Sequence, residues 1–372
     1  MEKYHELEEI GHGSYGVVFK AMNTMTGELV AIKKMIDRKY HSIKECMNLR
    51  EIKSLCKVKN HPNIVKLKEV VVENKILFLV FEYMECTLFD RMRYRKTPFP
   101  ETEIRNICFQ IFQGLAYMHG TVGYFHRDIK PENLLVSKDV IKIADLGQAR
   151  EINAKPPWYR APEVPLHARA HDSSVDMWAM GAIMFELFTL QPLFQGSSAT
   201  DVMRRICSVI GTPTETTWSL GIYHANNINY RFPEFPGVDL SSLLPSASPE
   251  AINLISTLLS WSPCARPTTK EALQHLFFYG CYRIPHPRFD GLTSSLMIKN
   301  RELPLVFKMA MRRENLKQIT RRLESCLSGL KGSVAPTEES IHSVVDLSST
   351  GCEGVVNYVD RIPAECEGIG MK

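Results

Sequence analysis

The chain has 372 residues, which is enough for roughly two or three folding units that each bury a core. Its formal net charge of +4 is too small to indicate a nucleic-acid partner, and its 44% hydrophobic and 23% charged residues are ordinary for a soluble globular protein. No apolar run reaches the length of a membrane span, and the charged residues 1–6 lack the apolar stretch of a secretory signal. We therefore expect neither nucleic acid nor a membrane as a partner.

The ten Cys residues are scattered along the chain and form no C-x-x-C pair. This distribution indicates reduced thiols rather than a zinc site or a disulfide framework. We therefore expect the protein in the cytoplasm, the nucleus or both. We also expect it to be a monomer.

Strand-like and helix-like stretches alternate in the first part of the chain, residues 1–85. The segment Ser42–Cys56 carries apolar residues at helical spacing and predicts one helix. The stretches with strand character are Leu7–Gly11, Val17–Met22, Leu29–Lys34, Ile64–Val72 and Ile76–Tyr83. Five strands and one helix make a small α+β unit.

Residues 86–280 have mostly helical patterns, with Pro and Gly at the breaks. Val175–Leu187 is apolar on most sides and predicts a buried helix. In the extension 281–372, apolar residues at 3–4 spacing among Arg and Lys predict one amphipathic basic helix over about 305–330, followed by disorder. This helix either packs on the preceding domain or binds a regulatory protein, and the sequence leaves both open.

Three polar residues define a candidate reaction centre. Asp128 and Asn133 lie in His126–Asn133, and Asp145 follows in an Asp-Leu-Gly triplet. An acid that orients a hydroxyl, beside oxygen ligands of the kind Mg²⁺ prefers, is what phosphoryl transfer from Mg-ATP requires. Any one of these residues alone is more often a surface group or a helix cap.

Two upstream motifs complete the set. Gly11, Gly13 and Gly16 form a G-x-G-x-x-G-x-V turn between two strand-like stretches, and an Ala-Ile-Lys strand ends at Lys33. A glycine cluster alone is more often a plain turn. In this order, however, the motifs resemble the eukaryotic protein kinases.

The resemblance implies an α+β bilobal fold. The expected protein kinase domain covers residues 1–280, with a small lobe of five antiparallel strands plus one helix (1–85) and a large, mainly helical lobe (86–280). It also implies that Asp128 is the catalytic base, that Lys130 stabilises charge on the transferred phosphoryl group, and that Asn133 and Asp145 bind Mg²⁺. The expected cofactors are ATP and Mg²⁺.

The resemblance also implies a set of nucleotide contacts. Lys33 would hold the phosphates and pair with Glu51, although either could be an ordinary solvated residue. Phe81 would be the gatekeeper, and the backbones of Glu82 and Met84 would bond adenine. The full expected set is Ile10, Gly11, His12, Gly13, Ser14, Tyr15, Gly16, Val17, Val18, Ala31, Lys33, Glu51, Phe81, Glu82, Met84 and Leu135.

Two further features implied by the resemblance are structural. Glu163 should form a buried ion pair with Arg266, and Asp176 should cap the backbone of the catalytic loop.

Several segments resemble one group of kinases more closely. These are Asn48–Ile52, Tyr124–Asp128, Ala149–Ile152 and Trp158–Glu163. Trp158–Glu163, with an insert over about 210–248, resembles the group of cyclin-dependent and MAP kinases. The other three segments, with Val175–Gly181, resemble the male-germ-cell-associated kinase family and its plant homologues within that group. The resemblance implies protein substrates phosphorylated on Ser or Thr, with Pro often following.

One segment departs from that family. Pro156-Pro157 runs directly into Trp158, where the family has about eight further residues that include a Thr-x-Tyr phosphosite. Tyr159 carries the only hydroxyl between Asp145 and Glu163. Two hypotheses follow: an active Ser/Thr kinase, or a nucleotide-binding scaffold of kinase fold with weak or no phosphotransfer.

Overall fold

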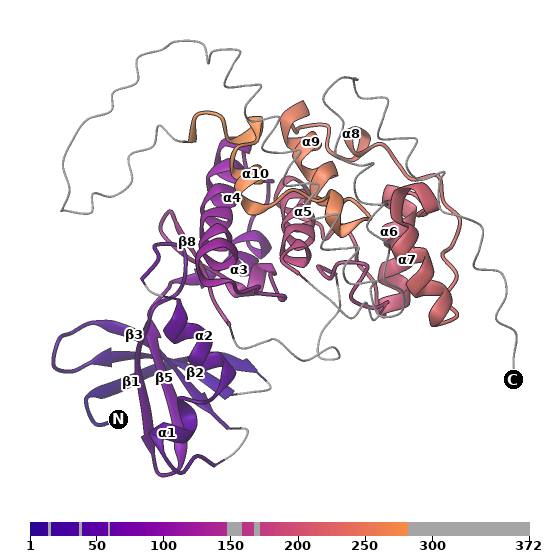
Figure 1. Cartoon of the computed structure of the whole chain (residues 1–372). Helices are drawn as coiled ribbons and strands as arrows, with labels where there is room; N and C mark the ends of the chain where they lie inside the picture. The colour runs from indigo at the N-terminus through magenta and orange to yellow at the C-terminus, as the bar shows by residue number, and fades with distance from the viewer. Residues whose placement is uncertain (14–15, 37–38, 59, 147–157, 167–171, 282–372) are drawn as a thin grey trace, which may run out of the picture. The chain divides into compact units, whose positions relative to one another are not determined.

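The computed structural model describes residues 1–281 except 14–15, 37–38, 59, 147–157 and 167–171, and for Arg50 and Glu51 it describes only the backbone (Figure 1). The predicted helix at 305–330 and the predicted disorder after it lie outside the described residues. So does most of the shortened segment that follows Asp145.

The small lobe is built on one antiparallel sheet of five strands in the order β1-β2-β3-β5-β4. The strands are β1 Tyr4–Gly13, β2 Gly16–Asn23, β3 Leu29–Met35, β4 Leu67–Glu73 and β5 Ile76–Glu82. Alternate residues of β5 enter different cores: Leu77 and Leu79 pack with Ile52 beneath the helices, whereas Phe78 and Val80 pack on the other face. The predicted five-stranded antiparallel sheet is therefore confirmed.

The prediction of one helix over Ser42–Cys56 is wrong in one respect. The segment forms two helices, α1 Ile43–Cys46 and α2 Arg50–Lys57. Between them Leu49 is extended (φ −61°, ψ 138°), and the side-chain amide of Asn48 donates to the Lys44 carbonyl at 3.2 Å. Asn competes for backbone hydrogen bonds in this way, so it favours a local break that apolar periodicity does not reveal.

The large lobe begins with a small sheet and continues as helices. The strands β6 Cys86–Thr87, β7 Leu134–Ser137 and β8 Val140–Ile143 pair in that order. The α-helices are α3 Leu88–Arg93, α4 Glu101–Ala116, α5 Ser174–Thr189, α6 Ala199–Ile210, α7 Glu215–Asn227, α8 Leu240–Leu243, α9 Pro249–Leu258 and α10 Thr269–Leu273. The shorter helical turns are η1 Tyr117–Val122, η2 Pro131–Asn133, η3 Pro263–Ala265 and η4 Leu276–Phe278.

Helix α5 is the centre of the large lobe. Its residues from Ser174 to Phe188 are all buried, which confirms the helix predicted at Val175–Leu187. Figure 1 shows α4 beside it and α9 above it, and both contact it. Because α5 is fixed from several sides, polar residues that it carries toward the catalytic loop are held rigidly.

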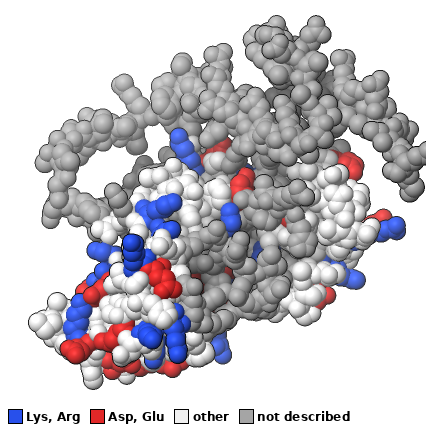
Figure 2. Space-filling view, turned by 60° about the horizontal axis from the view of Figure 1, so that its bottom comes forward, with Lys and Arg blue, Asp and Glu red and all other residues white. Residues whose placement is uncertain are grey.

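The described surface mixes both charge signs. Figure 2 shows Lys and Arg beside Asp and Glu on the face in view. Several of them pair, such as Lys20 with Glu8 at 2.9 Å and Lys68 with Glu28 at 2.6 Å. Among the helices that the structure describes, none has both the length and the apolar character needed to cross a bilayer.

Candidate active site

A cavity of about 1140 Å³ lies between the five-stranded sheet and the catalytic loop. Its walls bring together most of the residues predicted to bind nucleotide or perform chemistry. The predicted residues that line it are Ile10, Gly11, His12, Gly16, Val18, Ala31, Lys33, Phe81, Glu82, Met84, Asp128, Lys130, Asn133, Leu135 and Asp145. The size suits a nucleotide-sized ligand.

A few predicted contacts fall elsewhere. Val17 does not line the cavity, because it lies between Gly16 and Val18 on β2 and alternate strand residues point to opposite faces. Ser14, Tyr15 and the Glu51 side chain lie outside what the structure describes.

Glycine is required at position 16 because the backbone of β3 lies very close to it. A Cβ placed on it would lie 2.1 Å from the Lys34 carbonyl oxygen of the neighbouring strand β3. No side chain fits at this position without a backbone shift. Glycine therefore allows β2 to start this close to β3 beside the cavity.

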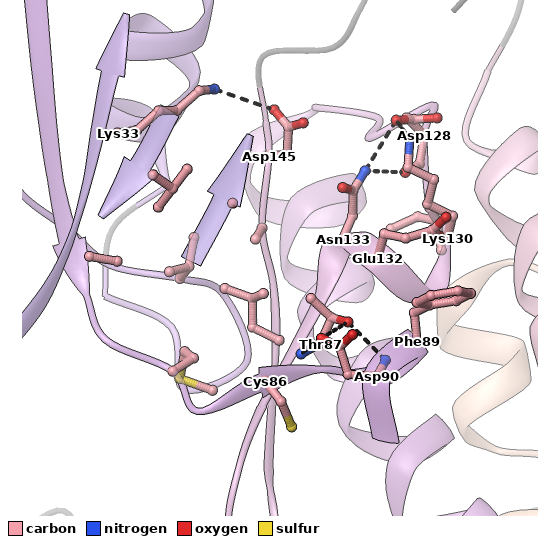
Figure 3. A pocket seen from close by; sticks show the side chains of 18 of the residues that line it. Lys33, Cys86, Thr87, Phe89, Asp90, Asp128, Lys130, Glu132, Asn133 and Asp145 are labelled. Atoms are coloured by element: carbon pink, nitrogen blue, oxygen red, sulfur yellow. Dashed lines mark hydrogen bonds and ion pairs between the residues drawn. The ribbon is translucent and has the colours of Figure 1, made fainter. Parts of the chain in front are cut away.

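Lys33 and Asp145 face one another across the cavity (Figure 3). The Lys33 Nζ lies 3.9 Å from Asp145 Oδ1. This carboxylate oxygen is buried, and no group among the described residues donates a hydrogen bond to it. The Asp145 backbone is left-handed (φ 60°). A buried carboxylate oxygen to which no described group donates is suited to a cation.

Asp128 is held by two side chains of its own loop. The Lys130 Nζ donates to Asp128 Oδ2 at 2.5 Å, and the Asn133 amide donates to the same oxygen at 3.1 Å and to the Asp128 carbonyl at 2.8 Å (Figure 3). No described residue donates to Oδ1 of either Asp128 or Asn133. The first oxygen is therefore available to a hydroxyl and the second to a cation.

The residues present fit a divalent cation. Asn133 and Asp145 offer one amide and one carboxylate oxygen, which are hard ligands, and the described residues contain no cluster of three or more His, Cys, Asp or Glu that could hold a metal. Mg²⁺ is typically bound by one or two protein carboxylates and completes its shell with water and substrate phosphates.

Asp176 of α5 anchors the catalytic loop, as predicted. Its side chain is 1% exposed and accepts bonds from the backbone amides of His126 (2.9 Å) and Arg127 (2.7 Å) and from His119 Nε2 (2.8 Å). Burial raises the pKa of Asp176, but the interactions with His119 and His126 outweigh burial and lower it below its usual value. An ionised carboxylate thus holds Arg127 in a left-handed conformation (φ 68°) directly before Asp128.

His126 connects the two halves of the reaction centre. Its Nδ1 accepts from the Asp128 amide at 3.3 Å, and its Nε2 lies 2.8 Å from the carbonyl oxygen of Ala144. A carbonyl only accepts, so Nε2 carries the proton in this bond. The loop with Asp128 is thereby fixed relative to Asp145, the next residue after Ala144.

The predicted pair of Glu163 and Arg266 is present. Two Arg266 nitrogens donate to the two carboxylate oxygens at 2.6 and 2.8 Å, and the residues are 3% and 1% exposed. Arg266 also donates to the carbonyls of Ser260, Ser174 and Trp261. The charge is therefore buried with its donors satisfied, as such a pair requires.

A buried acidic cluster beside the cavity was not predicted. The Tyr159 hydroxyl donates to Glu186 of α5 at 2.6 Å, and Glu132 lies close enough for its charge to act on both. Burial, and then the charge of Glu186, raises the pKa of Tyr159. Burial also raises the pKa of Glu186 to about 7, although the Tyr159 bond opposes this.

Comparison with known proteins agrees with this geometry. Residues 4–278 match the protein kinase domain family. The chain is 55% identical to cyclin-dependent kinase F-4 of Oryza sativa over 293 residues, which is 77% of this chain and 63% of that protein. It is 52% identical to cyclin-dependent kinase F-3 of the same species over 304 residues (80% of this chain, 70% of that protein). It is 48% identical to the human serine/threonine-protein kinase MAK over 320 residues (84% and 51%), so it spans about half of that relative.

Proposed function

Because this chain belongs to the protein kinase domain family, we propose that it transfers the γ-phosphate of ATP to Ser and Thr hydroxyls of protein substrates. The observation that carries the proposal is the arrangement around Asp128, which lines the cavity. Lys130 and Asn133 donate to one of its carboxylate oxygens, and no described residue donates to the other. A carboxylate placed in this way can orient and accept the proton of an attacking hydroxyl.

The other residues of the cavity have separate tasks in this proposal. Lys33 would hold phosphate oxygens, and Lys130 would stabilise charge on the group in transfer. Mg²⁺ held by the oxygens of Asn133 and Asp145 would supply neutralisation of the phosphate charge. Lys130 bonds Asp128 at 2.5 Å. This bond therefore also fixes the orientation of the carboxylate that would act as the base.

The family resemblance supports one finer feature, a preference for sites followed by Pro. From the sequence we further infer that the protein is a monomer in the cytoplasm or nucleus, and that the basic helix predicted over about 305–330 contacts a regulatory protein. The rice relatives are named cyclin-dependent kinases. A cyclin is therefore the first protein partner to test for this chain.

A second function is favoured by the sequence between Asp145 and Glu163. This segment contains no Ser or Thr, and its one hydroxyl, on Tyr159, is bonded to a buried carboxylate. A loop phosphate that could order the segment therefore has no acceptor there. If the substrate platform needs that order, the chain binds nucleotide and partners but transfers phosphate poorly.

Phosphate transfer to peptides distinguishes the two functions. Purified full-length chain is given labelled ATP, Mg²⁺ and either a Ser-Pro or a matched Ser-Ala peptide, with Asp145→Asn as the blank. Transfer above the blank, faster for Ser-Pro, is expected. No transfer by a protein that ATP still stabilises against heat would contradict the kinase proposal and support the scaffold.

A further inference from the structure

An ion pair outside the reaction centre joins the two lobes next to the cavity. Lys142 of β8 donates to both carboxylate oxygens of Glu82, the last residue of β5, at 2.7 and 2.9 Å. Glu82 also accepts from the Lys66 backbone amide at 2.8 Å. We call these three groups the hinge clasp, because the connecting segment 83–85 between the lobes follows Glu82 directly.

Strand β8 is itself fixed to the small-lobe chain. Val65 donates to the Ile143 carbonyl at 2.9 Å, and Ile143 donates to the Asn63 carbonyl at 2.9 Å. The Asn63 side chain also donates to the Ile141 carbonyl at 3.0 Å. Lys142 therefore extends from a strand that cannot shift alone. Its bond to Glu82 holds the Glu82 side chain in a fixed position relative to β8.

The environment of Lys142 favours the pair. Its side chain is 16% exposed and that of Glu82 is 23% exposed, so water screens the pair only in part. Burial, and then the charge of Lys142, lowers the pKa of His61, which places the ammonium group near a neutral ring. Among the described residues, Glu82 is the carboxylate that pairs with Lys142.

The hinge clasp lies at the wall of the cavity. Glu82 lines the cavity, as do Tyr83, Met84 and Glu85 of the connecting segment. The backbone of Glu82 is bonded to Lys66 as well, since the Glu82 amide donates to the Lys66 carbonyl at 3.1 Å. Without Lys142, the Glu82 carboxylate keeps its bond from the Lys66 amide on the small lobe but loses its bond to β8.

We propose that Lys142 is a positioning residue for nucleotide binding: through Glu82 it fixes the connecting segment against which the base of the nucleotide lies. The inference rests on the proposed nucleotide site. The segment is remote from Asp128 and the transferred group, so it contacts the nucleotide equally in the ground and transition states. Loss of such uniform binding raises KM and leaves kcat unchanged.

The test compares two Lys→Met variants in the full chain. Lys142→Met removes the charge and keeps the length of the side chain. Lys68→Met is the matched control, because it breaks a Lys–Glu pair of similar length (2.6 Å to Glu28) and similar Lys exposure (23%) that does not line the cavity. Calorimetric ADP binding is the first readout, because it does not depend on phosphate transfer.

Lys142→Met is expected to weaken ADP binding by about three- to tenfold, the size of one lost charged hydrogen-bonding partner in a partly exposed site. Lys68→Met should bind like the wild type, and Lys142→Arg should recover most of the loss. In the transfer assay, the KM for ATP should rise while kcat stays within about twofold.

Unchanged ADP binding in Lys142→Met would overturn the proposal. So would a raised kcat with an unchanged KM, because the clasp would then restrain lobe movement instead of positioning nucleotide. If Lys142→Met does not fold, Glu82→Gln makes the same test, since it keeps one acceptor for Lys66 but loses the charge. A wild-type chain that binds ADP but transfers no phosphate would refute the kinase proposal while leaving this one standing.

Discussion

The raised pKa of Glu186 predicts an unusual dependence of stability on pH. The pKa of this buried carboxyl rises from 4.5 to about 7. In the unfolded chain the group ionises near 4.5, whereas in the folded chain it keeps its proton up to about 7. Between these values only the unfolded state loses the proton, so rising pH favours unfolding, and above about 7 the effect levels off.

The size of the effect follows from the same shift. At about 1.4 kcal/mol for each pKa unit, Glu186 lowers the free energy of unfolding by on the order of 3 kcal/mol between pH 4.5 and 7. Glu186→Gln removes the titration but keeps an oxygen that accepts from Tyr159, whose bond measures 2.6 Å. The variant should match the wild type near pH 4.5 and be more stable by up to about 3 kcal/mol near pH 8.

Urea unfolding followed by Trp fluorescence at pH 5 and pH 8 measures this difference. The exposed Glu234→Gln is the matched control and should follow the wild type at both values. Equal stability differences between Glu186→Gln and the wild type at pH 5 and pH 8 would refute the account of this cluster.

Three further predictions concern the fold and the cavity. Glu163→Gln leaves the Arg266 charge buried without its partner and should cost about 3–5 kcal/mol of unfolding free energy; a loss below 1 kcal/mol in denaturant titration would contradict this. Gly16→Ala brings a Cβ to 2.1 Å from the Lys34 carbonyl and should cost about 1–3 kcal/mol and weaken ADP binding, whereas wild-type binding would show that the turn adapts. Mass spectrometry of the chain from cells should find no phosphate on Tyr159, whose hydroxyl is bonded inside the large lobe; stoichiometric phosphate there would show that the bond opens.

Strong local patterns predicted much of the fold. The five strands were predicted because each is a short apolar stretch between turn residues, and Val175–Leu187 was predicted as buried because it is apolar on most sides. The Glu163–Arg266 pair and the cap by Asp176 were expected from motifs that the family resemblance supplied. Such motifs predict contacts between distant residues, because each motif residue has a fixed position in the family's fold.

Most of the features that were missed depend on contacts between residues that lie far apart in the sequence. The break between α1 and α2 is local, but apolar periodicity does not reveal it, because it is marked only by the extended Leu49 and the bond from the Asn48 side chain to the Lys44 carbonyl. The contact between Tyr159 and Glu186 joins a loop to α5, and the bond between Lys142 and Glu82 joins two lobes. Each of these residues is polar and common on protein surfaces, so the sequence alone does not indicate which residue it contacts.

The central claim is that this chain transfers phosphate without a phosphorylated segment before Glu163. The most direct measurement is the initial rate of transfer from labelled ATP to a Ser-Pro peptide, with protein that has first been treated with phosphatase and with Asp128→Asn as the blank. The account predicts a rate that the phosphatase does not change and that Asp128→Asn abolishes. A rate no higher than the blank, in protein that ADP still stabilises against heat, would contradict it.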